Sequence, residues 1–161
     1  MSPYGGVQTN IDEIAELKRA YDYVRDGNTV ILEPYNEMDL QIGNIFSDVK
    51  CPNGPLDMRK TENYINQMNK KIENVKQYPT FPKNGDFRLE IDASDGFSDG
   101  LNLNNYGEHF NQKLKDILNN EELEHSINEV YIISSDGSIL RGQKNIQTKL
   151  MDWDMIPSQG W

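Results

Sequence analysis

The sequence predicts an α/β fold in which a mixed central β-sheet is flanked by helices. Segments with helical spacing of apolar residues alternate along the chain with short segments rich in β-branched residues, which is the pattern of interleaved helices and strands. The length of 161 residues fits one domain with one core. We therefore expect residues 1–161 to form a single domain, with residues 1–9 and 145–161 at its periphery.

The first expected element is a helix over residues 11–26. Thr9 or Asn10 is a suitable N-cap, and Gly27 ends the segment. Its large apolar residues recur at helical spacing and predict the face that packs on the core: Ile11, Ile14, Leu17, Tyr21 and Val24.

The remaining elements follow in order. Strands are expected over 28–33 and 86–92, a hairpin over 38–52, and a further strand over 129–133 that leads through an Asp-Gly turn into another. Helices are expected over 59–78 and 108–127. The tail over 147–161 is predicted to be irregular, although its two tryptophans indicate that it packs on the domain.

Charge is distributed unevenly. The formal net charge of −10 argues against indiscriminate binding to nucleic acid, which depends on Lys and Arg contacts to phosphates. Residues 58–83, however, carry six basic and two acidic side chains, whereas residues 86–136 carry three basic and twelve acidic ones. This asymmetry suits a protein with one phosphate-facing side, and it is equally consistent with chance variation on an acidic surface.

Compartment signals are few. No apolar run is long enough to span a membrane, and the N-terminus does not resemble a signal peptide, so we expect no membrane contact. Cys51 is the sole cysteine, which excludes an internal disulfide and suits a protein that folds or acts in cytosol.

The hairpin carries the main chemical signal. Gly43-Asn44 predicts a two-residue type II′ turn, and the resulting register sets Leu40 opposite Ser47 and Asp39 opposite Asp48. Because side chains alternate along a strand, Asp39, Asp48 and Lys50 should project from one face. Two opposed aspartates repel unless a cation lies between them, and Mg²⁺ is held by one or two carboxylates. The alternative is that both aspartates point into solvent and Lys50 pairs with Glu37.

This stretch, "LEPYNEMDLQIGNIFSDVK", resembles the core of the PD-(D/E)XK nuclease superfamily, the restriction-endonuclease-like fold. There a helix is followed by a strand and a hairpin that bears an Asp and then Asp/Glu-X-Lys. The chain over residues 10–140 also resembles C-terminal toxin domains of bacterial contact-dependent inhibition and polymorphic toxin systems, through its "DLQIGNIFSDVK" and "VYIISSDG" segments.

The resemblance implies roles for particular residues. Asp39 and Asp48 would hold Mg²⁺ (or Mn²⁺ or Zn²⁺), Lys50 would assist the nucleophile, and a glutamate of the first helix would complete the site. Glu13 borders the apolar face and is preferred, with Glu16 and Glu33 as alternatives. A polar residue of the next helix, Gln67 or Asn63, would contact nucleic acid, with Lys70 and Lys71 on phosphates.

Two functions from different classes are expected, and a cytosolic housekeeping nuclease of the same fold is a third possibility. One is a metal-dependent nuclease toxin that is secreted as part of a larger protein, cleaves tRNA or DNA in the cytoplasm of a competing bacterium and has a cognate immunity protein. The other is an acidic immunity or inhibitor protein that binds a basic toxin without catalysis. A concave site that gathers Asp39, Asp48 and Lys50 would favour the nuclease.

Overall fold

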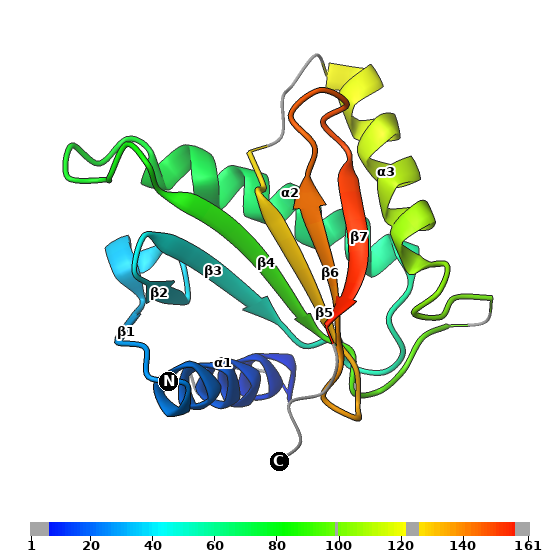
Figure 1. Cartoon of the computed structure of the whole chain (residues 1–161), viewed down its shortest axis with the longest axis horizontal. Coiled ribbons are helices and arrows are strands. Elements are labelled where there is room, and N and C mark those ends of the chain that lie inside the picture. Colours follow the sequence, from blue (N-terminus) through cyan, green and yellow to red (C-terminus); the bar gives the residue numbers. More distant parts are fainter. Residues whose placement is uncertain (1–6, 99, 122–125, 157–161) are drawn as a thin grey trace.

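The computed structural model describes residues 7–98, 100–121 and 126–156 (Figure 1). These form one seven-stranded mixed sheet and three α-helices, which confirms the predicted α/β class. The elements are α1 (Val7–Arg25), β1 (Val30–Leu32), the short 3₁₀ helix η1 (Pro34–Asn36), β2 (Leu40–Ile42), β3 (Ile45–Lys50), α2 (Met58–Val75), β4 (Asp86–Asp92), α3 (Tyr106–Glu121), β5 (Glu129–Ile133), β6 (Ile139–Lys144) and β7 (Met151–Ile156).

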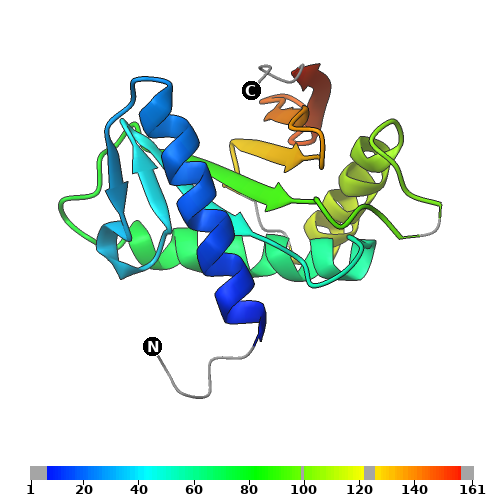
Figure 2. The same cartoon turned by 90° about the horizontal axis from the view of Figure 1, so that it is seen from below.

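The strands lie in the sheet in the order in which they occur in the chain. β3, β4 and β5 are parallel, with α2 and α3 as the connections between them, while the other neighbours pair antiparallel. α2 and α3 cover one face of the sheet, and α1 crosses the other (Figure 2). The sheet is therefore buried on both faces over β3 and β4, where the predicted site residues lie.

The helix α2 is built as the sequence predicts. Asp57 caps its N-terminus by accepting a hydrogen bond from the Lys60 N–H at 2.8 Å. Its apolar side chains at helical spacing are fully buried against β3 and β4: Ile65, Met68, Ile72 and Val75. The polar side of α2 is left for Lys70 and Lys71.

The prediction for α1 is wrong in its orientation. The helix begins at Val7, before the expected N-cap at Thr9 or Asn10. The stripe predicted to face the core is turned to solvent, with exposed fractions of 59% for Ile14, 62% for Leu17, 67% for Tyr21 and 56% for Val24. The sheet is instead contacted by the other side of the helix, including Ala15, Ala20 and Tyr23.

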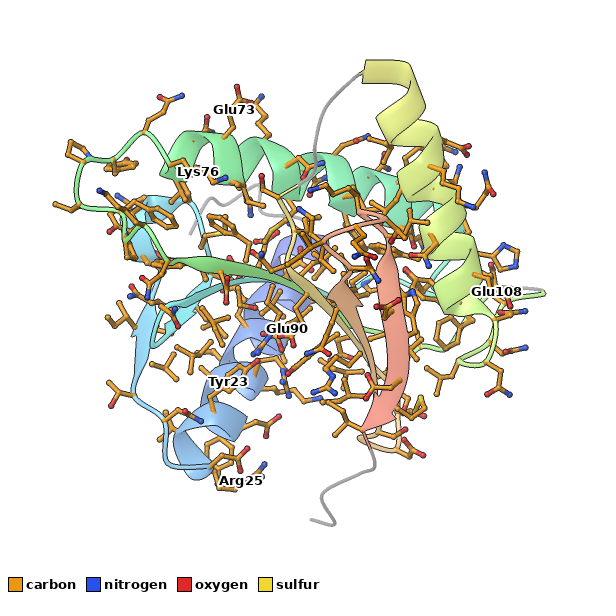
Figure 3. The ribbon with its side chains drawn as sticks, turned by 45° about the horizontal axis from the view of Figure 1, so that its top comes forward. Tyr23, Arg25, Glu73, Lys76, Glu90 and Glu108 are labelled. Atoms are coloured by element: carbon orange, nitrogen blue, oxygen red, sulfur yellow. The ribbon has the colours of Figure 1, made fainter. Side chains whose placement is uncertain are left out.

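Polar residues of β4 explain this orientation. Glu90 is fully buried on the α1 face of the sheet. Its carboxylate accepts hydrogen bonds from Arg19 Nε at 2.7 Å, from the Tyr23 hydroxyl at 2.9 Å and from the Ser47 hydroxyl. Figure 3 shows Tyr23 on α1 and Glu90 on the sheet that α1 crosses. Since a buried carboxylate is costly without partners, the helix must present its polar side inward.

The C-terminal segment departs from the prediction as well. Residues 151–156 are not irregular but form the edge strand β7, paired with β6. Trp153 packs edge-on against Phe110 and Tyr106, as its aromatic character indicated, whereas Trp161 lies outside the described residues. Within the described part of the chain, none of the helices is long and apolar enough to cross a membrane.

Candidate metal-dependent active site

The hairpin has the predicted register. Ile42 pairs with Ile45, Gln41 with Phe46 and Leu40 with Ser47, and Gly43 has the positive φ of 60° that the tight turn requires. β3 continues to Lys50, beyond the last residue that pairs with β2. On the side that faces β2, the main chain of residues 48–50 therefore has no strand partner.

The side chain of Asp39 lies against this unpaired main chain. Its backbone N–H donates to the Ser47 carbonyl at 3.0 Å, which ends the regular register one residue before the expected pairing with Asp48. Its Oδ2 accepts the Val49 N–H at 2.7 Å, in place of a strand carbonyl. The carboxyl group is thereby held beside the carboxyl group of Asp48, although the two residues are not a regular cross-strand pair.

The two carboxyl groups strongly perturb one another. Burial, followed by the negative charge of Asp48, raises the pKa of Asp39 to about 9. Asp48 is fully buried, and no donor among the described residues lies within hydrogen-bond distance of its Oδ2. At neutral pH the two carboxyl groups therefore share one proton, unless a bound cation stabilises the form in which both are ionised.

Two lysines lie near Asp48, one on the same strand and one on α2. Lys71 Nζ of α2 donates to Asp48 Oδ1 at 2.7 Å, and Lys50 Nζ lies 3.6 Å from Oδ2. The charges of Asp48 and then Asp39 raise the pKa of Lys71 against the opposing effect of burial, so its ammonium is kept protonated. Asp48 and Lys50 thus project together toward α2, as the alternation predicts, while Leu40, Ile42 and Val49 pack beneath α1.

Of the two glutamates of α1 considered for the site, the structure places Glu16 beside Asp39 and not the preferred Glu13. Glu16 hydrogen-bonds with Asp39, and burial raises its pKa together with the nearby charges of Asp48 and Glu33. Glu13 is exposed, because the orientation of α1 places the polar side of the helix on the sheet. The sequence did contain a signal for this orientation of α1, a stripe of polar residues at helical spacing: Asp12, Glu16, Arg19 and Tyr23.

A hollow opens beside these groups. Glu33, Asn36, Glu37, Met38, Asp39 and Lys71 line it. Three residues in or next to its lining have left-handed backbone conformations that non-glycine residues seldom adopt, with φ of 50° at Glu33, 59° at Tyr35 and 57° at Asn36. Packing of Tyr35 on Phe46 and Phe81 helps to hold this segment in place. Strain of this kind is concentrated at functional sites.

The chemistry of the donor set fits Mg²⁺ or Mn²⁺. Two adjacent carboxylates, one of which has a buried oxygen with no backbone, lysine or arginine donor within hydrogen-bond distance among the described residues, suit a hard cation that takes its other ligands from water and phosphate. Across the residues that the structure describes, no group of three or more His, Cys, Asp or Glu side chains is arranged to hold a metal. Zn²⁺, which usually has three or four protein ligands, fits less well.

The predicted nucleic-acid contacts lie on α2. Gln67 is exposed one turn before Lys71 and so lies on the same side of the helix. Lys70 is also exposed but is rotated about 100° from Lys71, and Asn63 is exposed near the start of the helix. Of the predicted helix residues, the structure brings Lys71 into direct contact with the acidic pair.

Comparisons with protein-family models, with curated proteins and with solved structures find no match to this chain.

Proposed function

We propose that this protein is a metal-dependent nuclease with a restriction-endonuclease-like fold, in which Asp39 and Asp48 hold Mg²⁺ and Lys50 is the catalytic base or electrophile. The observation that carries the proposal is the buried contact of Asp39 with Asp48, flanked by Lys50 at 3.6 Å. The order of a helix, a strand and an acidic hairpin agrees with the resemblance seen in the sequence.

The chain's own residues supply three functions. Asp39 and Asp48 provide the oxygens for the cation, and the hydrogen bond from Val49 N–H fixes the orientation of Asp39. Lys50 is 14% exposed and can orient or deprotonate a water, or stabilise charge on a phosphate. Glu16 accepts or shares a proton with Asp39. Bound Mg²⁺ would lower the pKa of a water and polarise the phosphate.

The substrate class follows from the charge distribution. The segment that contains α2 carries the local excess of basic residues, and Lys71 and Gln67 lie on one side of this helix. A phosphodiester backbone passing over the acidic pair would be attracted by this side. We infer that the substrate is tRNA or DNA.

From the resemblance of residues 10–140 to toxin domains, we further propose that the chain acts as a toxin domain of a larger secreted protein in the cytoplasm of a target cell. It would then have an acidic or otherwise complementary immunity partner.

Cleavage assays test the proposal. Supercoiled plasmid DNA and purified tRNA are incubated separately with the wild-type chain and with Asp48→Asn, in Mg²⁺ and in a chelator. We expect Mg²⁺-dependent cleavage of one substrate by the wild type and at least about a hundredfold loss in Asp48→Asn. Circular dichroism of both proteins shows whether the loss reflects the site or the fold.

The acidic inhibitor remains the rival function, supported by the net charge of −10. If the folded wild-type chain cleaves neither substrate in Mg²⁺ or Mn²⁺, the nuclease proposal fails. Tight, salt-sensitive binding to a basic toxin would then support the inhibitor.

A further inference from the structure

The charge of Asp48 is neutralised by Lys71, a residue outside the Asp-X-Lys motif. Lys71 lies 23 positions later in the chain, on α2, and reaches the fully buried Asp48 carboxylate with a 2.7 Å hydrogen bond to Oδ1. Lys50, which belongs to the Asp-X-Lys motif, is farther away at 3.6 Å. Among the described residues, the closest cation to Asp48 is therefore Lys71.

Lys71 also has a second environment within reach. Its side chain is 27% exposed and forms part of the wall of the hollow that Glu33, Glu37 and Asp39 line. A lysine ammonium is a compact charge on a flexible four-carbon stem, so it can leave one acceptor for another without movement of the helix. The Asp48 carboxylate, by contrast, is buried on β3, where an ionised group is costly without a positive partner.

We propose that Lys71 is an internal stand-in for the metal: it neutralises Asp48 in the metal-free protein and gives up this position when a divalent cation binds. The released ammonium is then free to contact a phosphate of the substrate. This inference rests on the proposed function, because it assumes that Asp39 and Asp48 receive the cation.

Displacement of Lys71 by the metal has a thermodynamic consequence that a permanent ion pair lacks. If Lys71 competes with the metal, its removal destabilises the metal-free protein more than the metal-bound protein. By linkage, the same difference appears as tighter metal binding. If the contact between Lys71 and Asp48 persists in both states, its removal costs the same stability in both.

The experiment compares Lys71→Met with the exposed neighbour Lys70→Met and with Lys71→Gln, which retains a donor for Asp48 without the charge. Mn²⁺ binding is measured by calorimetry at about pH 8, where the carboxylates that bind the metal are more readily deprotonated, and thermal unfolding is measured in a chelator and in saturating Mn²⁺. We expect Lys71→Met and Lys71→Gln to bind Mn²⁺ about tenfold more tightly than the wild type, within the usual range of coupling between two sites. Their loss of Tm should be largest in the chelator, and Lys70→Met should match the wild type.

Equal or weaker Mn²⁺ binding by the Lys71 variants, with a wild type that does bind Mn²⁺, overturns the inference and leaves the metal site intact. An equal loss of Tm in chelator and in Mn²⁺ overturns it in the same way. A wild type that binds no Mn²⁺ overturns both the inference and the proposed function. If Lys71→Met does not fold, Lys71→Gln provides the comparison.

Discussion

Substitution of Asp39 by Asn tests the electrostatic reasoning before any substrate is known. Burial and the charge of Asp48 raise the pKa of Asp39 from an ordinary 3.8 to about 9. Between these values the folded protein holds a proton that the unfolded chain has released. The contribution of Asp39 to the stability of the metal-free protein is therefore highest at low pH and falls as pH rises toward 9. The amide of the Asp39→Asn variant has no such proton to lose, so the substitution should remove this dependence.

The pKa values set the size of the effect. Within the window between 3.8 and about 9, each pH unit changes the free energy of unfolding by about 1.4 kcal/mol. From about pH 6 to about pH 8 the wild type should lose about 3 kcal/mol relative to Asp39→Asn. For a chain of this length that corresponds to a relative change in Tm of about 6–12 °C. Titrating groups that do not interact with Asp39 affect both proteins alike and cancel in the comparison.

Urea unfolding in a chelator at the two ends of this pH range measures the difference. Asp26→Asn is the matched control, because the side chain of Asp26 is 59% exposed on the loop after α1. Parallel pH profiles for the wild type and Asp39→Asn would refute the reasoning, as would a wild type that gains stability over this range relative to Asp39→Asn. Saturating Mn²⁺ should reduce the pH slope of the wild type only, because the cation replaces the proton.

Four further substitutions test the structure around the site. Glu33→Gly should raise the free energy of unfolding by about 1 kcal/mol, measured by urea titration, because glycine adopts the observed φ of 50° without strain. Leu17→Gln should change stability by no more than about 0.5 kcal/mol, whereas Ala20→Leu should cost about 1–3 kcal/mol by overpacking; the reverse order would mean that α1 packs through its apolar stripe. Glu90→Gln should cost about 3–5 kcal/mol, because it removes the buried carboxylate that pairs with Arg19 Nε and leaves Asp22, 3.1 Å from Nη1, as the remaining acidic partner of Arg19; a loss below about 1 kcal/mol would contradict the described network.

The hairpin could be predicted from local chemistry. Gly43-Asn44 fixes the turn, and the turn fixes which residues of β2 and β3 oppose each other, so the approach of Asp39 to Asp48 follows from a few positions. The turn could not indicate that β2 begins only at Leu40, one residue after Asp39. Asp39 then leaves the regular register and binds the main chain of Val49 through its carboxylate.

The orientation of α1 could not be predicted from its own sequence. Its apolar stripe indicated one buried face, and in β4 Arg88 and Glu90 alternate with apolar residues, a pattern typical of a half-exposed strand. In the structure these two polar surfaces pack on each other, because Arg19 and Tyr23 satisfy Glu90. Each pattern is locally consistent with exposure, and only their tertiary contact makes both buried. The same reversal places Glu16 rather than Glu13 at the site.

The contact of Lys71 with Asp48 was hidden for a similar reason. The sequence placed Lys70 and Lys71 on an exposed helix face, and neighbouring lysines on a helix cannot be distinguished until the helix is docked on the sheet. β7 was missed although Met151, Trp153 and Met155 alternate with aspartates. Proline and glycine beyond it, in the last residues of the chain, favoured an irregular tail.

The central claim is that the Asp39–Asp48 pair and Lys50 form a metal-dependent phosphodiesterase site. The most direct test is the rate of Mg²⁺-dependent cleavage by the wild type and by Lys50→Met, with Mn²⁺ affinity measured on the same samples. We predict that Lys50→Met loses at least about a hundredfold in rate while binding Mn²⁺ no more weakly than the wild type. Undiminished cleavage by Lys50→Met, or no cleavage of tRNA or DNA by the folded wild type, would contradict it.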